Sequence, residues 1–550
     1  MARVRSAVDA VAERYLDTVA ELDPCTATEL GITGRDRDYD EDITDYSPDG
    51  VAARAEAARA ALKELDGVAA VDETDAVTAA AMRERLGVLV EIHDAGLDVG
   101  ELNVIASPLQ TMRDVFDLMP TGSDEDWAVI GRRLAALPQR VPGYAEALRV
   151  AVAEGRPPAI RQVQRGVAQA AQIERLFVDM VAGAATDPAL QADLDRHAAA
   201  AAAAYRDLGR VLREDIAPHA PDRDAFGRDA YRLLSRSFLG AAVDLDETYA
   251  WGLDQLEAIV AEQVTVAERL YPGAGVAETI RRLDGEPRYQ VHGTEALQQW
   301  MQTLSDRVVD ALAGTHFDIA PALRTLECRI APTQTGGIYY TGPSEDLTRP
   351  GRMWWSVPPG KETFHTWQET TTVFHEGVPG HHLQIGHAVV LADQLNRWRR
   401  LGCWVSGHGE GWALYAERLM AELGWLDDDG ARMGMLDAQR FRAARVAIDI
   451  GVHCGLRAPD GGTWDAQRAW EFLRAHSAQS DDHLHFELDR YLGWPGQAPS
   501  YAVGQRIWQQ LRETMLARSM PLKEFHSRAL DLGGLPLDVL RAALLEEFTR

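Results

Sequence analysis

Apolar residues that recur every three or four positions through the first 310 residues constrain the fold of this chain more than any other feature. This spacing places the apolar side chains on one face of an α-helix. Many of these segments are rich in alanine, which has the highest helix propensity, and clusters of Pro, Gly and Asp separate them. The predicted helices span residues 3–22, 51–66, 73–94, 125–136, 143–155, 160–183, 188–215 and 246–270.

Between residues 325 and 360 the pattern changes to that of short strands. Leu326–Ile330, Gly337–Tyr340 and Gly351–Val357 are β-branched or aromatic runs bounded by turn residues, and helical spacing returns after them. We therefore expect a mostly α protein with two helical lobes around a deep cleft. The first lobe spans 1–320, and the second, 321–550, carries a small β-sheet.

The composition excludes several classes of function. The net charge is −28, whereas nucleic-acid binding needs a basic surface. No apolar run reaches the roughly 18 residues of a membrane span, and residues 1–20 lack the apolar core of a signal peptide. Cys25, Cys328, Cys403 and Cys454 are far apart, so reduced and mostly buried thiols are expected. We expect a cytoplasmic protein that binds neither membrane nor nucleic acid.

A His-Glu motif in the second half indicates a metal site. The string from Phe374 to Gln384 is Phe-His-Glu-Gly-Val-Pro-Gly-His-His-Leu-Gln. In metallohydrolases, His-Glu-x-x-His places two metal ligands and a general base on one helix face. Here Pro379 occupies the second His position, so the motif is a variant. Ten of the sixteen histidines lie between residues 365 and 485, which is the clustering expected near a metal.

The proline decides which histidines can bind one ion. On an unbroken helix His381 points about 120° away from His375, and His382 lies roughly 10 Å along the axis. Pro379 lacks an N–H and clashes with the carbonyl four residues back, so the helix must bulge or kink. If the bulge absorbs two residues, His381 moves into the ligand position. We expect His375 and His381 as ligands, with His382 as the alternative, and Glu376 as the general base.

The third ligand is expected from a following helix. The candidates are His387, Asp393, His408, Glu410 and Glu417. Glu410 is preferred because flanking glycines allow close approach of the backbone and the helical pattern starts there. Glu417 lies two turns on, on the same face, and could orient a ligand or pair with a nearby Arg.

Three strings in this chain resemble a known family. Phe374–Gln384, Glu410–Glu417 and Pro495–Tyr501 are similar to the bacterial "domain of unknown function 885" (DUF885) family. Its pattern is His-Glu-x-x-Pro-Gly-His, then Glu-Gly-Trp-Ala-Leu-Tyr-x-Glu, then Pro-Gly-Gln-Ala-x-x-Tyr. The family is grouped with the zincin peptidases, near helical zincins of the thimet oligopeptidase and angiotensin-converting types. The resemblance covers most of the chain as one continuous domain and implies one Zn²⁺, bound by His375, His381 and Glu410, with Glu376 as base.

Two further groups of residues are candidates for a role in the site. Arg445, Asp449 and His453 form a polar stripe at i, i+4 and i+8 on an apolar helix. The stripe is either a charge ladder, or it places His453 against a substrate carbonyl or carboxylate with Arg445 and Asp449 supporting the site from behind. Tyr501 is a candidate donor to the oxyanion of a tetrahedral intermediate, or else a packing aromatic.

The strand region supplies candidate substrate contacts. If the 337–357 strand borders the site, Tyr339, Tyr340, Arg352 and Trp354 line a cleft; otherwise they pack the core. An edge strand beside the metal helix could also pair with an extended peptide. The Trp-rich segment 398–412 is predicted to be core.

The function that these residues favour is zinc-dependent hydrolysis of a peptide or amide bond in short peptides or small amides. Glu376 would deprotonate water, and Tyr501 or His453 would stabilise the oxyanion. One alternative is a zincin-like enzyme that acts on a specialised small molecule. Another is an inactive helical binding protein. The sequence does not indicate an oligomeric state.

Overall fold

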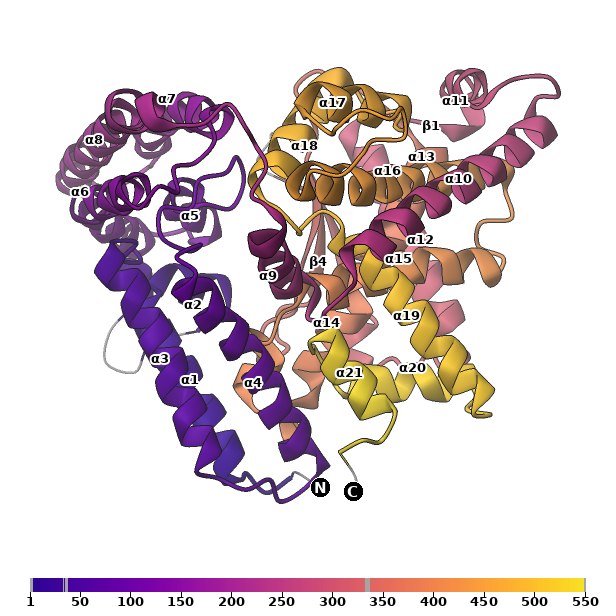
Figure 1. Ribbon diagram of the computed structural model, residues 1–550, viewed down its shortest axis with the longest axis horizontal. Coiled ribbons are helices and arrows are strands. Elements are labelled where there is room, and N and C mark those ends of the chain that lie inside the picture. The colour runs from indigo at the N-terminus through magenta and orange to yellow at the C-terminus, as the bar shows by residue number, and fades with distance from the viewer. Residues whose placement is uncertain (1–2, 33, 35–37, 332–336, 549–550) are drawn as a thin grey trace.

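The structure is a computed structural model that describes residues 3–32, 34, 38–331 and 337–548. Helices make up most of these residues, and short strands form two small sheets (Figure 1). The predicted mostly α fold with a small sheet is therefore confirmed. No helix in the described ranges combines the length and apolar character needed to cross a membrane.

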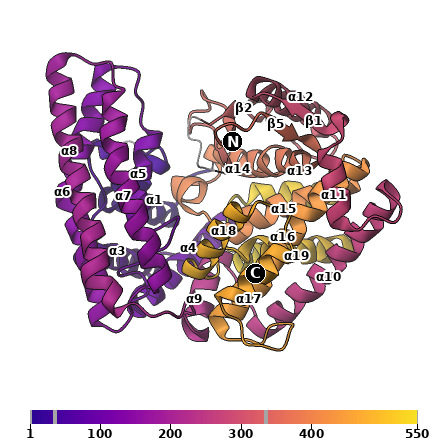
Figure 2. The ribbon, with the colours of Figure 1, turned by 90° about the horizontal axis from the view of Figure 1, so that it is seen from above.

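Helices α5 to α8 form an N-terminal block with a core of its own, whereas α1, α3 and α4 supply side chains to the main core of the protein. The long helices α6, α7 and α8 lie side by side along one edge of the molecule (Figure 2), and α8 packs against both of the others. Side-chain caps begin many of these helices; Ser6 and Asp9, for example, form a capping box at the start of α1. The helices are α1 (Ala7–Leu22), α2 (Pro24–Glu29), α3 (Pro48–Asp66), α4 (Glu73–Asp94), α5 (Pro108–Asp114), α6 (Asp124–Ala153), α7 (Ile160–Ala182) and α8 (Pro188–Val211).

Helix α6 differs from the sequence prediction. Two helices were expected at 125–136 and 143–155, but one helix continues through Pro138 and Pro142. Each proline removes one backbone hydrogen bond, which favours a break. A continuous buried stripe crosses both prolines and packs in the core of the N-terminal block, so tertiary packing outweighs this local cost. Its residues include Leu134, Leu137, Val141, Tyr144 and Leu148.

The next helices pack against later parts of the chain. Helix α10 lies along α16 (Asp429–Cys454), and α12 packs on strand β2 (Leu326–Ile330). These contacts cross the predicted lobe boundary at residue 320, and the two-lobe division itself stays a prediction. The helices of this segment are α9 (Arg228–Leu239), α10 (Leu245–Leu270), α11 (Val276–Asp284) and α12 (Thr294–Leu312).

The strands confirm the three predicted strand segments. In the larger sheet β4 (Gly351–Trp355) is central, parallel to β2 and antiparallel to β3 (Ile338–Thr341). The β4 residues Gly351, Met353 and Trp355 are buried, as alternation along a half-buried strand requires. A second pair, β1 (Gln290–His292) and β5 (Thr363–His365), is antiparallel. Strand β3 packs against α13 (Thr366–Glu376) and strand β4 against α14 (His381–Val390). These two helices carry the His-Glu motif.

Helices after the sheet surround the motif. Helices α15 and α19 approach so closely at Gly411 that a Cβ there would lie 2.5 Å from the carbonyl carbon of Gly504. Helix α13 packs against both α15 and α16. The helices are α13 (Thr366–Glu376), α14 (His381–Val390), α15 (Ser406–Glu422), α16, α17 (Ala466–Ala475), α18 (Asp481–Gly493), α19 (Ser500–Ala517), α20 (Leu522–Asp531) and α21 (Leu537–Leu544).

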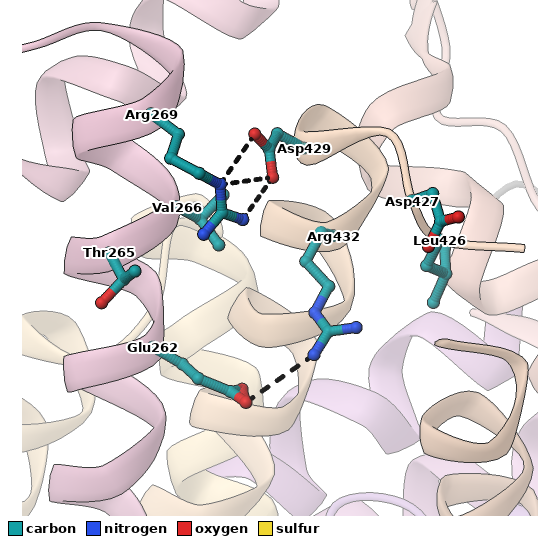
Figure 3. A pocket seen from close by; sticks show the side chains of 8 residues that line it. All are labelled: Glu262, Thr265, Val266, Arg269, Leu426, Asp427, Asp429 and Arg432. Atoms are coloured by element: carbon teal, nitrogen blue, oxygen red, sulfur yellow. Dashed lines mark hydrogen bonds and ion pairs between the residues drawn. The ribbon is translucent and has the colours of Figure 1, made fainter. Parts of the chain in front are cut away.

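Two hollows lie away from the motif. A cavity of about 700 Å³ is lined by the turn at 96–102, the start of α7, helix α9 and Trp494. A smaller hollow of about 230 Å³ lies between α10 and the start of α16, where Arg269 pairs with Asp429 and Arg432 with Glu262 (Figure 3). Neither is lined by the predicted metal ligands, and the predicted deep cleft around the motif stays a prediction.

Candidate metal centre

The His-Glu motif folds as two helices joined by a short turn. Helix α13 ends at Glu376 and α14 begins at His381, and wide backbone hydrogen bonds span the turn, from the Gly380 amide to the Phe374 carbonyl at 3.1 Å and from the His382 amide to the Gly377 carbonyl at 3.2 Å, so the helix is disturbed at Pro379 as expected. Trp412 on α15 donates a hydrogen bond to the Pro379 carbonyl at 2.8 Å. A Cβ at Gly380 would lie 1.9 Å from the carbonyl oxygen of His375, so only glycine fits there. The turn therefore sets how His381 approaches His375.

Three side chains from α13, α14 and α15 converge. Glu410 Oε2 lies 3.3 Å from His375 Nε2 and 3.4 Å from His381 Nε2. The three ligand atoms lie within 4.8 Å of one another, and no other set of three or more His, Cys, Asp or Glu in the described residues meets that criterion. These are the ligands that the sequence favoured.

The donor set fits zinc. Two imidazole nitrogens and one carboxylate oxygen form a common set in catalytic zinc sites. Zinc bonds of about 2.0–2.1 Å in a tetrahedron place neighbouring ligand atoms roughly 3.3 Å apart. The two separations between Glu410 and the histidines are 3.3 and 3.4 Å, so they agree with that spacing.

Glu417 orients the first histidine. Its Oε1 accepts a hydrogen bond from His375 Nδ1 at 2.8 Å, and its Oε2 accepts one from Thr371 at 3.0 Å. A carboxylate on the far nitrogen fixes the ring so that Nε2 faces Glu410. Burial lowers the pKa of His375, but hydrogen bonds to Glu410 and Glu417 outweigh it and raise that pKa to about 9. Glu417 thus has the ligand-orienting position that the sequence suggested.

Opposite effects act on the Glu410 carboxyl. Burial alone would raise its pKa, but the charges of His381 and His375 and their hydrogen bonds hold it well below the usual range. Glu410 is therefore ionised, as a metal ligand must be.

Glu376 is the one acidic group at this centre that lacks a partner. Its side chain is buried beside both histidines, yet it makes no hydrogen bond or ion pair within the part of the chain that the structure describes. Burial raises its pKa and outweighs the lowering effect of His381 and His375. Neither carboxyl oxygen is fully closed off from solvent, so water can reach this group, as a proton acceptor requires.

Tyr501 lies close enough to Glu410 for the charge of that carboxylate to act on its hydroxyl group. The Arg445 guanidinium lies 5.1 Å from the centre of the Tyr501 ring. Burial, and then the charge of Glu410, raise the pKa of Tyr501, so its hydroxyl stays protonated at neutral pH. That hydroxyl has no hydrogen-bond partner among the described residues and remains available as a donor.

His382, the alternative ligand, points elsewhere. Its Nδ1 accepts a hydrogen bond from the Tyr340 hydroxyl at 2.9 Å, and its Nε2 donates to the Leu323 carbonyl at 2.8 Å. Both ring nitrogens are therefore occupied. Between the two open candidates, the geometry selects His381.

The far end of the α16 polar stripe does not reach the metal ligands. His453 Nε2 donates to the Tyr491 carbonyl at 2.9 Å, and its Nδ1 accepts from the Phe226 amide at 3.4 Å. Eight helical residues span about 12 Å, so the two ends of one stripe have different neighbours. The predicted oxyanion role of His453 is corrected to a structural one. Asp449 accepts from the Gly496 amide at 2.9 Å and so holds the turn that precedes Tyr501.

The candidate substrate-binding residues of the strand region contact other residues of the same sheet. Arg352 pairs with Glu327 at 2.8 Å, and Trp354 donates to Thr341 at 3.0 Å. Tyr339 is 40% exposed and stacks on Trp354. Their predicted substrate contacts stay a prediction. The Tyr340 hydroxyl is already hydrogen-bonded to His382.

Two residues near the centre were missed by the sequence reasoning. Trp404, in the segment predicted as core, is 48% exposed and packs over Gly409, with its ring 6.4 Å from that of His381. Arg442 on α16 lowers the pKa values of Glu417 and Glu376 through its charge. The signal for Arg442 was its place one turn before Arg445, on the face of the same stripe.

Comparisons with known proteins support the fold. A family model described as "Bacterial protein of unknown function (DUF885)" matches residues 24–544. A crystal structure of a putative lipoprotein from Colwellia psychrerythraea has a TM-score of 0.85 at 20% identity, covering 99% of this chain and 100% of that one. A structure of a putative lipoprotein of unknown function from Shewanella oneidensis has a TM-score of 0.74 at 15% identity, covering 98% of this chain and 100% of that one. At such identities the likeness shows the fold alone. Among curated proteins no match was found.

Proposed function

Because the chain belongs to the DUF885 family of bacterial proteins of unknown function, its family assigns no reaction, and we propose from the site itself that it is a zinc-dependent hydrolase of peptide or amide bonds. The substrates are short peptides or small amides. His375, His381 and Glu410 hold the ion, and Glu417 fixes the orientation of His375.

The observation that carries this proposal is the unpartnered Glu376 carboxylate. It is buried next to two of the three ligand side chains and has no hydrogen bond within the described residues. A purely structural cluster gains nothing from such a group, because Glu376 makes no hydrogen bond that would hold the cluster together, while its oxygens remain within reach of water. A hydrolase needs a base at this position to take a proton from water.

The reaction follows from the positions of three groups. A bound zinc ion supplies a Lewis acid that polarises the substrate carbonyl and makes water more acidic. Glu376 takes a proton from the attacking water and gives it to the leaving amine nitrogen. The Tyr501 hydroxyl, which stays protonated because its pKa is raised, donates a hydrogen bond to the oxygen that becomes negative.

The test uses a mixed-sequence tetrapeptide library incubated with zinc-loaded protein, with the products identified by mass spectrometry. We expect hydrolysis by the wild type and rates at least about 100-fold lower for Glu376→Gln, since removing a general base costs that much or more. Glu422→Gln is the matched control, because Glu422 is a half-exposed residue on α15 paired with Arg512.

Two results would contradict the proposal. One is equal hydrolysis by the wild type and Glu376→Gln when both hold zinc, which would show that Glu376 is not the general base. The other is no cleavage of any peptide or small amide by zinc-loaded wild type, which would favour a binding protein or an enzyme for another substrate.

A further inference from the structure

Three arginines lie near Tyr501, and two of them share one carboxylate. Arg445 Nη2 lies 2.7 Å from Glu487 Oε2, and Arg490 Nη1 lies 2.9 Å from Glu487 Oε1. The guanidinium of Arg442 is 5.9 Å from the centre of the Tyr501 ring. Glu487 is thus fully used by two of the three cations, and it is buried with a pKa lowered to about 2.

Arg442 keeps most of its hydrogen-bonding capacity. Its one hydrogen bond within the described residues goes from Nη1 to the Ala438 carbonyl of its own helix, at 3.2 Å. Its Nε is buried and has no partner. A guanidinium has five N–H donors in a planar fork. Arg442 therefore presents unused donors beside Tyr501, close enough to Glu376 to influence that carboxyl electrostatically.

We infer that Arg442 binds a carboxylate of the substrate, and that this carboxylate is the carboxyl terminus of a short peptide. The inference rests on the proposed function. A planar guanidinium matches a carboxylate through two parallel hydrogen bonds. The carboxyl terminus is the one anion that every unmodified peptide carries. Binding it beside the base places the scissile bond near that end, so the enzyme releases residues from the carboxyl terminus of short peptides.

The competing explanation is structural. The Arg442 charge, after burial, is the largest influence on the pKa of Glu417 and acts to lower it, so Arg442 could serve only to keep that carboxylate ionised behind His375. A structural role predicts changes in zinc retention or folding that do not depend on the substrate. Carboxylate binding predicts an effect that depends on whether the peptide ends in an acid or an amide.

The first experiment compares the tetrapeptide library in two forms, one with free carboxyl termini and one with terminal amides. Aspartate and glutamate side chains are present in both forms, so the comparison isolates the terminal carboxylate. We expect the wild type to prefer the acid form, with cleavage near the carboxyl terminus. In Arg442→Gln, kcat/KM for the acid form should fall about 10- to 100-fold more than kcat/KM for the amide form, as loss of a charge-assisted bidentate pair does.

The controls separate charge from fold. Arg442→Lys keeps the charge but lacks the planar fork, so it should fall between wild type and Arg442→Gln. Arg432→Gln, at the outer surface of the same helix beside Glu262 (Figure 3), should match the wild type. Equal cleavage of both forms by the wild type, or an equal loss on both forms in Arg442→Gln, would overturn the inference.

A binding measurement makes the result independent of catalysis. Zinc-loaded Glu376→Gln is dialysed against each library, and the retained peptides are measured by mass spectrometry. We expect retention of the acid form over the amide form, and loss of that preference when Arg442→Gln is added. Preferential retention without hydrolysis by the wild type would uphold carboxylate binding and reject the proposed function. Hydrolysis without any preference, or no retention of either form, would reject carboxylate binding.

Discussion

Replacing Glu417 by Gln tests whether this buried carboxylate prepares His375 for a metal. The change keeps the shape of the side chain but removes the charge that accepts the His375 Nδ1–H hydrogen bond at 2.8 Å. Loss of such a partner typically weakens metal binding about 10- to 100-fold, or about 1.4–2.7 kcal/mol. The side chain can still accept from Thr371, which is 3.0 Å away, so the local packing is retained.

The size of the effect depends on pH. His375 has a pKa of about 9 in the metal-free protein, and zinc must displace its proton. At pH 7 this competition weakens zinc binding by about 100-fold in the wild type, and at pH 9 by only about twofold. The Glu417 hydrogen bond is one cause of the raised His375 pKa. In the variant this pKa is lower, so the proton competes less strongly with zinc at pH 7. The variant's deficit should therefore be larger at pH 9 than at pH 7.

The assay is competition with a chelator of known zinc affinity at both pH values. Glu422→Gln is the control, since Glu422 lies on the same helix and pairs with Arg512 at the surface. The reasoning is refuted if Glu417→Gln binds zinc as tightly as the wild type at pH 9, or if the control loses as much.

Three further substitutions probe separate parts of the account. Gly380→Ala puts a Cβ 1.9 Å from the His375 carbonyl oxygen, so we expect about 1–3 kcal/mol of destabilisation and a lower zinc content, measured by urea unfolding and mass spectrometry. Tyr501→Phe should lower kcat about 100- to 1000-fold while zinc content is unchanged, in steady-state assays on a cleaved peptide. Burial raises the pKa of Asp449 from 3.8 to about 7, so the folded protein keeps a proton that the unfolded chain releases, and stability falls as pH rises through that window. Asp449→Asn should remove that loss and gain up to about 4 kcal/mol over the wild type between pH 4 and pH 8, as urea unfolding would show.

The sequence was sufficient to select the three side chains that converge, because the pattern that marks them is local. Two histidines around Pro379 and a glutamate flanked by glycines identified all three convergent groups. The course of the backbone at Pro379 was harder to predict, because local sterics indicate only that the helix is disturbed there. The form of the turn between α13 and α14 also depends on tertiary contacts such as the Trp412 hydrogen bond to the Pro379 carbonyl.

Long-range packing explains what could not be predicted. The continuity of α6 through two prolines follows from a buried stripe whose partners lie far away in the sequence. On α16, Arg432, Arg442 and Arg445 look alike in the sequence, but Arg432 pairs with Glu262, the charge of Arg442 acts on Glu417 in the candidate metal centre, and Arg445 pairs with Glu487. Helix periodicity gives the face of a residue but not the partner opposite it. For the same reason His453 was placed at the site when its ring is bound to backbone groups elsewhere.

The most direct test of the account is metal content. Wild type and His375→Ala are purified without chelators, and zinc is measured by plasma mass spectrometry. The account predicts about one zinc per wild-type chain and almost none in His375→Ala, because two remaining ligands do not make a zinc site. No zinc in the wild type, even after zinc is supplied, would contradict it.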